Sequence, residues 1–235
     1  MLFMFMVLSF VSGCVTTQHP NQTLGTVHQQ NLVIGGKGES IPLPNGDWKL
    51  IDYKVKIYNN GTSFGLGYLI QEVDGVATGV VEFDISLDTI AGGYALSEAC
   101  GNPSFVHRVT KANYEGREQD CWWIDNEGTK RISGFPDIKE QAWKYIVSNK
   151  VKMPTEMIFV KYRRATKTRL FAVHYGFNPE SEGISPAKHF DSYHSEWSKK
   201  NLHRDSAKYD YVQKLKLWGA TFDPKVTAGF NHRTQ

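Results

Sequence analysis

Apolar and polar side chains alternate with a period of two along several segments of the chain. Residues 51–58 alternate most regularly, which is typical of a strand with one buried face. Segments 63–70 and 77–87 follow the same pattern, and Asp74-Gly75 between them is a strong signal for a hairpin turn. The pattern therefore predicts three antiparallel strands that form a meander.

Further strands are expected later in the chain. Residues 158–162 and 171–177 alternate on either side of a short polar segment, which predicts a second hairpin. Two less regular strands are expected around residues 105–109 and 121–124.

Helix signals interrupt these strands. Asp137 and Glu140 have the spacing of a capping box, so a helix is expected from Asp137. Residues 185–186, a serine followed by proline, predict a second helix start. Asp205 is expected to cap a third helix, and Gly219 to end it.

The order of elements is strands, helix, strands and helices, which predicts an α+β fold. Most strands adjoin without a crossover helix, so the sheet is expected to be mainly antiparallel. About three helices are expected to pack on one face of this sheet. Residues 31–235 have the length of one domain.

The first fourteen residues are an apolar run that ends in small residues and a cysteine. The run is shorter than the roughly 20 residues that a membrane-spanning helix needs, and it has the form of a secretory signal without the usual basic start. Val11-Ser12-Gly13-Cys14 resembles the lipobox of bacterial lipoproteins. The alternative is a buried strand or helix with an ordinary cysteine.

The resemblance implies a signal peptide over residues 1–13, cleaved before Cys14. Cys14 would then carry a diacylglycerol and an N-acyl chain, and several acyl chains anchor a protein stably at about 0.8 kcal/mol per buried methylene. Val15 is not the aspartate that favours inner-membrane retention, so the expected location is the periplasmic face of the outer membrane. Residues 14–30 are polar and uncharged, and are expected to form a flexible tether.

Two cysteines remain after Cys14, and an oxidising compartment favours their pairing. A disulfide between Cys100 and Cys121 would stabilise the fold by roughly 3 kcal/mol. The alternative is two separate buried thiols. No CxxC motif or close Cys/His pair accompanies them, so no metal site is expected there.

Charge is distributed unevenly along the chain. Residues 1–128 hold seven basic and fourteen acidic side chains, whereas residues 129–235 hold twenty basic and ten acidic ones. Two interpretations stay open. The halves complement each other or form solvated faces, or the second half presents a basic surface to an anionic partner. No nucleic-acid-binding signature occurs, and no nucleic-acid partner is expected.

The densest basic cluster lies on the second predicted hairpin, whose tip is expected to be exposed. Such a cluster would suit an anionic or protein partner, and the alternative is a set of charges that protects an exposed edge from aggregation. Its members are Lys161, Arg163, Arg164, Lys167 and Arg169.

Other candidate chemistry is weak. His189, Asp191 and His194 cannot share one helix face well, so no metal is expected, and no cofactor motif occurs. No GxSxG elbow marks a nucleophile, and the catalytic residues stay unknown. Trp122-Trp123 places two indoles on opposite faces of a strand, either one exposed to a ligand or both buried.

A second resemblance covers two short stretches, the segment from Ile41 to Trp48 and the predicted helix from Tyr211 to Gly219. They are similar to uncharacterised secreted proteins of Gram-negative bacteria, which implies a location but no activity. The leading hypothesis is a non-catalytic binding or assembly module, anchored in the outer membrane, that engages an anionic envelope component or another envelope protein. The alternative is an envelope hydrolase acting on glycan or lipid, which needs a histidine such as His107, His174 or His194 beside a carboxylate.

Overall fold

The computed structural model describes residues 22–34, 38–59, 61–90, 92–129, 136–188 and 195–232, with the backbone only for residues 136–139. Cys14, the expected signal over residues 1–13 and the expected tether over residues 14–30 as far as residue 21 lie outside the described residues, as do His189, Asp191 and His194. Within the rest of the expected tether, Val27–His28 form a short strand that pairs with residues 48–49. Within the described part, no helix is both long and apolar enough to cross a membrane.

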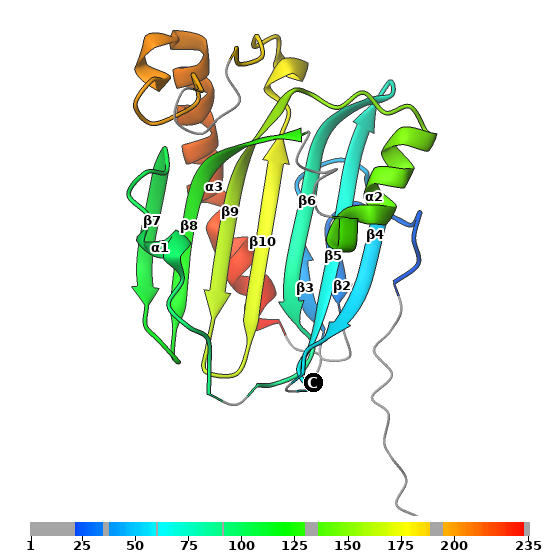
Figure 1. Ribbon diagram of the computed structural model, residues 1–235, viewed down its shortest axis with the longest axis vertical. Coiled ribbons are helices and arrows are strands. Elements are labelled where there is room, and N and C mark those ends of the chain that lie inside the picture. Colours follow the sequence, from blue (N-terminus) through cyan, green and yellow to red (C-terminus); the bar gives the residue numbers. More distant parts are fainter. Residues whose placement is uncertain are drawn as a thin grey trace, which may run out of the picture.

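A large antiparallel sheet forms the body of the molecule (Figure 1). Its eight strands run in the order β1-β4-β5-β6-β10-β9-β8-β7, and β2 and β3 form a separate small sheet. The strands are β1 (Val27–His28), β2 (Asn31–Ile34), β3 (Glu39–Pro42), β4 (Trp48–Ile57), β5 (Ser63–Val73), β6 (Val76–Ser86), β7 (His107–Asn113), β8 (Gln119–Gly128), β9 (Glu156–Ala165) and β10 (Leu170–Phe177). The helices are α1 (Glu98–Gly101), α2 (Pro136–Ser148) and α3 (Ser206–Asn231), with short 3-10 turns at Pro179–Glu182 and Leu202–Arg204.

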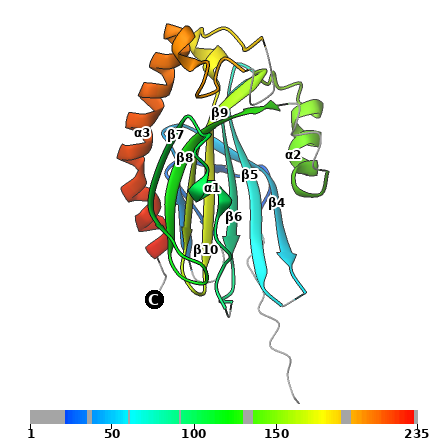
Figure 2. The ribbon, with the colours of Figure 1, turned by 60° about the vertical axis from the view of Figure 1, so that its left-hand side comes forward.

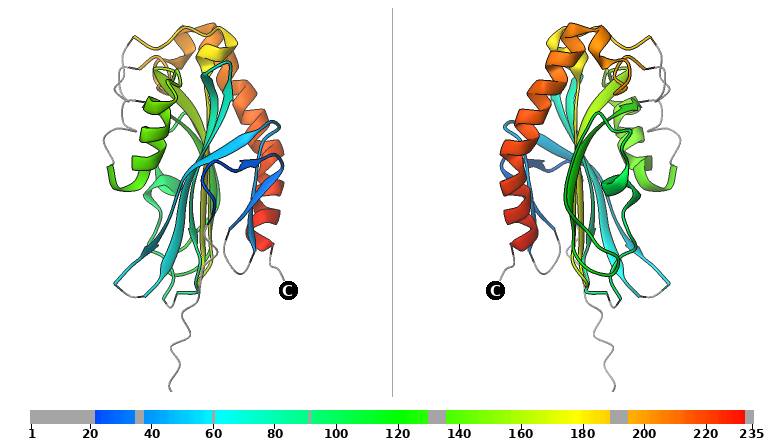
Figure 3. Two further views of the ribbon diagram at one scale, coloured as in Figure 1. Left: turned by 90° about the vertical axis from the view of Figure 1, so that its right-hand side faces the viewer. Right: turned by 90° about the vertical axis from the view of Figure 1, so that its left-hand side faces the viewer.

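This architecture confirms the α+β prediction, and with it the β4-β5-β6 meander and the β9-β10 hairpin. The helices, however, cover both faces of the sheet rather than one. Figures 2 and 3 show α3 and the β2-β3 hairpin on one side and α2 on the other. The α3 side holds the main hydrophobic core, and α2 covers a second, smaller core over β4 and β5.

Helix α3 begins after Asp205, as the sequence predicts, but it ends twelve residues beyond the predicted end at Gly219. The Asp205 side chain accepts a hydrogen bond from the Lys208 backbone N–H at 3.1 Å and caps the helix. Gly219 does not end the helix, which continues to Asn231. A Cβ at Gly219 would lie 2.8 Å from the Trp122 ring, so this glycine allows the helix to approach the sheet closely.

The expected helix over residues 137–149 is α2, and a buried carboxylate fixes its place on the sheet. Asp52 of β4 accepts hydrogen bonds from the backbone N–H groups of Gln141 and Ala142, at 3.1 and 3.2 Å. Ala142 and Ile146 are buried against the second core. In contrast, residues 184–188 have no helical structure, so the described part of the segment after Ser185 does not form the expected helix.

The disulfide between Cys100 and Cys121 is confirmed, with the two Cα atoms 5.7 Å apart. It joins α1 to β8, and Trp123 packs beside it in a small core. Trp122 points to the opposite face, beneath α3, so both indoles of the Trp122-Trp123 pair are buried.

Candidate functional site

The predicted basic cluster does not form an exposed patch. Lys161, Arg164 and Arg169 are only 6%, 2% and 8% exposed, Arg163 is half-buried, and Lys167 alone is exposed. The reason is the position of the hairpin, because β9 and β10 lie in the middle of the large sheet instead of at its edge. Alternation then sends neighbouring basic side chains to opposite faces of the sheet, and Arg164 faces α3.

Carboxylates meet most of these buried cations. Arg164 pairs with Asp120 at 3.0 Å and with Asp223 of α3. Lys161 pairs with Glu127 and lies 3.6 Å from Asp125.

Most of these pairs join the basic second half of the chain to the acidic first half. The strand order explains this, since β10 pairs with β6 and β9 pairs with β8. Arg169 likewise lies 3.8 Å from Glu39, although its Nη1 also donates to the Phe230 carbonyl at 3.0 Å. Three cations of the second half, Lys161, Arg164 and Arg169, are therefore complemented by carboxylates of the first half within the fold.

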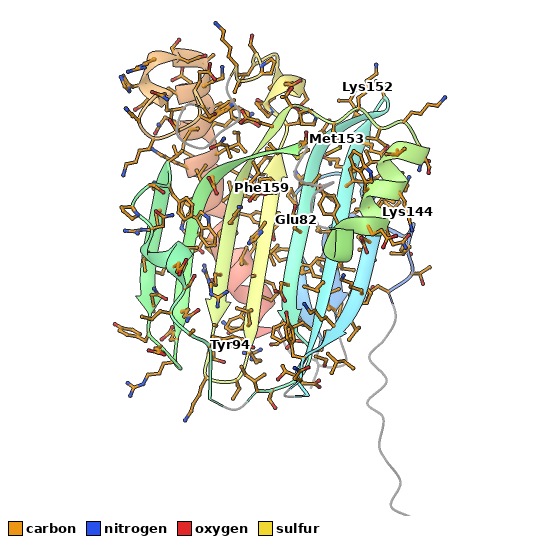
Figure 4. The ribbon with its side chains drawn as sticks, viewed as in Figure 1. Glu82, Tyr94, Lys144, Lys152, Met153 and Phe159 are labelled. Atoms are coloured by element: carbon orange, nitrogen blue, oxygen red, sulfur yellow. A yellow bond between two sulfur atoms is a disulfide. The ribbon has the colours of Figure 1, made fainter. Side chains whose placement is uncertain are left out.

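Between α1 and α2, the described residues place no helix over the middle strands on the face that Figure 1 presents, and we call this area the uncovered face. A row of charged residues crosses it in register: Glu82 of β6 lies opposite His174 of β10, which lies opposite Lys161 of β9. His174 Nδ1 is 4.0 Å from Glu82 Oε2. The His174 ring also faces Trp123, with ring centroids 6.1 Å apart. Figure 4 labels Glu82 over the middle of this face.

A second row lies two residues further along the same strands. Asp84 of β6 is opposite Ala172 of β10, and Ala172 is opposite Arg163 of β9. Arg163 donates from Nε to Gln119 Oε1 at 2.7 Å. Asp84 Oδ1 is buried, and it has no hydrogen-bond partner among the described residues. Burial raises the pKa of the Asp84 carboxyl to about 6, although Arg163 nearby acts in the opposite direction.

A cavity of about 270 Å³ opens at the outer end of the sheet, between the start of β7 and the segment before α3. We call it the β7 cavity, and it is lined by Asn102, Pro103, Phe105, Val106, His107, Arg108 and Lys199. Three of these side chains are basic and none is acidic. Arg108 and Lys199 are exposed, and Lys199 donates from Nζ to the Pro103 carbonyl at 3.0 Å.

His107 forms the inner wall of the β7 cavity. Its ring lies against Trp122, with centroids 4.7 Å apart. Burial lowers the pKa of His107, and the positive charge of Lys216 lowers it further. The imidazole is therefore neutral near pH 7 and becomes a third cation as the pH falls.

Most residues of the uncovered face and of the β7 cavity were not predicted as site residues from the sequence. Glu82 and Asp84 appear in it only as the polar positions of an alternating strand, and nothing local marks their strand partners. His107 and His174 were candidates only because a histidine was needed beside a carboxylate, and the structure brings His174 alone of these two near one. Among the described residues, no group of three or more His, Cys, Asp and Glu side chains is arranged to hold a metal ion.

Comparison with known proteins adds no family. No protein-family model, no curated protein sequence and no solved structure matches the chain.

Proposed function

We propose that this protein is a lipid-anchored binding module on the periplasmic face of the outer membrane, and that it holds an anionic envelope component at the β7 cavity. One observation carries the choice of ligand: Arg108, Lys199 and His107 line one cavity without an acidic side chain. Elsewhere, most cations of the basic hairpin are engaged by carboxylates within the fold. The β7 cavity thus offers cations that face an opening, where they favour anions.

The proposed location depends on Cys14 and the lipobox resemblance. The Cys100–Cys121 disulfide supports it, because disulfides persist in oxidising compartments such as the periplasm. Replacing Cys14 with alanine should move the protein from the membrane fraction to the soluble fraction. If the Cys14→Ala protein stayed membrane-bound, the lipid anchor would be refuted.

Titration with lipopolysaccharide tests the anionic ligand. Trp122 lies against His107, so an anion in the β7 cavity should change tryptophan fluorescence. The change should weaken with added salt, because exposed charges are screened within about 10 Å at 0.1 M ionic strength. The Arg108→Gln and Lys199→Gln double variant should bind at least about tenfold more weakly, a loss of about 1.4 kcal/mol.

Lys167→Gln is the matched control, because Lys167 is an exposed cation away from the β7 cavity lining. It should bind as the unaltered protein does. No fluorescence response at low salt, or an equal loss in the control and the double variant, would exclude the β7 cavity as an anion site.

The hydrolase alternative has one observation in its favour, the 4.0 Å approach of His174 to Glu82 on the uncovered face. In that function Glu82 would orient the imidazole, and His174 would accept a proton from water as a general base. Release of sugar or fatty acid from purified envelope, abolished in a His174→Asn variant, would favour it. Absence of such release would leave the binding module as the function.

A further inference from the structure

Within the described residues, the two exposed cations of the β7 cavity have no carboxylate partner. Arg108 makes no hydrogen bond or ion pair there, and Lys199 Nζ bonds only to the Pro103 carbonyl. Lys214, another exposed lysine, instead pairs with Glu182 at 2.5 Å. Two unpaired positive charges at one opening attract a dianion more strongly than a monoanion. A phosphate monoester is such a dianion, with a charge of about −2 near pH 7.5.

The β7 cavity is larger than a phosphate group. Its volume of about 270 Å³ is the share of roughly nine water molecules in the liquid, at about 30 Å³ each. A phosphate group fills about half of this volume. The remaining space admits one ring-sized group beside the phosphate.

An aromatic side chain lines the β7 cavity next to the cations. Phe105 is half-buried, and its ring stacks on Trp123 with centroids 5.6 Å apart and the ring planes 17° from parallel. This stacking holds the Phe105 ring in place from within the fold. Pyranose rings present a face of C–H groups, which packs favourably against an aromatic ring. Phe105 therefore favours a sugar as the ring-sized group.

Asn102 adds an uncharged hydrogen-bond donor to the same lining. Its Oδ1 accepts hydrogen bonds from the backbone N–H of Ser104 at 2.9 Å and from the Ser104 hydroxyl at 2.6 Å. These two bonds orient the amide, whose Nδ2 makes no hydrogen bond among the described residues. The Nδ2 donor is thus available to an oxygen of a ligand.

We propose that the β7 cavity binds the phosphate monoester of a single sugar ring within a phosphorylated envelope glycan. Arg108 and Lys199 hold the phosphate through charge-assisted hydrogen bonds, and the guanidinium can supply two parallel donors. Phe105 packs against the C–H face of the ring, and Asn102 Nδ2 donates to a ligand oxygen. This ligand assignment rests on the proposed function, because both concern the same cavity.

Isothermal titration of the full-length protein in detergent at about pH 7.5 compares ligands of matched shape. Glucose 6-phosphate should bind at least about tenfold more tightly than glucose 6-sulfate, which carries a single negative charge. It should also bind at least about tenfold more tightly than inorganic phosphate, which has no ring. Equal binding of either comparison ligand, or no binding of glucose 6-phosphate at millimolar concentration, would overturn the proposal. The ligand series needs no variant, so it is independent of protein folding.

Variants test the ring contact. Phe105→Leu should weaken glucose 6-phosphate binding about threefold to tenfold and leave the binding of inorganic phosphate unchanged. Tyr114→Leu is the matched control, because Tyr114 is an aromatic residue that is 61% exposed outside the cavity lining, and it should bind both ligands normally. Unchanged glucose 6-phosphate binding in Phe105→Leu, or an equal loss of both ligands, would contradict the ring contact.

A second variant tests the amide contact. Asn102→Asp keeps the oxygen that accepts from Ser104 and replaces the Nδ2 donor with a negatively charged oxygen. Glucose 6-phosphate and inorganic phosphate should therefore both bind at least about tenfold more weakly. Undiminished binding of glucose 6-phosphate would remove Asn102 from the site.

Lipopolysaccharide separates this ligand assignment from the proposed function. Enzymatic removal of its phosphates should weaken its binding at least about tenfold, and the intact form should displace glucose 6-phosphate. Equal binding of both forms would overturn phosphate recognition and leave the binding module as the function. A failure to displace glucose 6-phosphate would overturn the envelope glycan as the source of the phosphate. If neither lipopolysaccharide nor glucose 6-phosphate binds, the proposed function fails as well.

Discussion

Replacing Asp84 with asparagine should stabilise the protein. Burial raises the pKa of Asp84 from 3.8 to about 6, which means that the folded state disfavours the ionised carboxylate. Each unit of pKa shift corresponds to about 1.4 kcal/mol, so the ionised carboxylate costs the fold about 3 kcal/mol. Asparagine has nearly the same shape and carries no charge.

The sign of the pH dependence follows from proton binding. Between about pH 4 and pH 6 the folded state holds the Asp84 proton and the unfolded state has released it, so stability falls as the pH rises through this interval. The full cost is present above about pH 6 and is absent below about pH 4. Asp84→Asn should therefore gain about 3 kcal/mol at about pH 7.5 and almost nothing at about pH 4.

Urea denaturation of both proteins at the two pH values measures this difference. For a chain of this size, the gain at about pH 7.5 corresponds to a rise of about 6 to 12 °C in the melting temperature. Asp74→Asn is the matched control, because Asp74 is an exposed carboxylate in the β5-β6 turn, and it should leave stability unchanged at both pH values. Equal stability of Asp84→Asn and the unaltered protein at about pH 7.5, or an equal gain at both pH values, would refute the inference that burial makes the ionised Asp84 carboxylate costly.

Three further predictions concern stability. Glu156 is only 1% exposed and burial raises its pKa to about 7, so Glu156→Gln should stabilise the fold by about 3 kcal/mol at about pH 8, and by little near pH 4, in urea denaturation. Replacing both Cys100 and Cys121 with alanine should cost roughly 3 kcal/mol, measured in the same way, and a reducing agent should then have no further effect. Gly219→Ala should cost about 1 to 3 kcal/mol because its Cβ would collide with Trp122, and an unchanged melting temperature would contradict the close approach of α3.

Local patterns were sufficient for the parts of the fold that depend on neighbouring residues. Alternation and the Asp74-Gly75 turn predicted the meander, and the capping box at Asp137 predicted α2. Gly219 was interpreted wrongly because its small size serves packing against Trp122 rather than a helix end. That contact joins residues almost a hundred positions apart, and no local pattern contains it.

The candidate sites depend on the same long-range information. The basic cluster was expected at the exposed tip of a hairpin, whereas most of its members lie along β9 and β10, between β6 and β8. Only this insertion places Arg163 near Asp84 and His174 near Glu82. The sequence supplied the residue types of the uncovered face, but not the strand order that brings them together.

The position of the β9-β10 hairpin also determines when the sheet can be completed during folding. The meander β4-β5-β6 and the pair β7-β8 are not neighbours in the sheet. They are joined by the β9-β10 hairpin, which begins after residue 155, because β10 pairs with β6 and β9 pairs with β8. Contacts of such long sequence separation slow folding, because the chain loses conformational entropy when the loop closes, before the new strand pairs form and stabilise it. Until then the edges of β6 and β8 offer unpaired backbone groups to any other chain. A nascent molecule therefore remains open and unassembled until its last third has been synthesised, and it is exposed to aggregation if synthesis stops early.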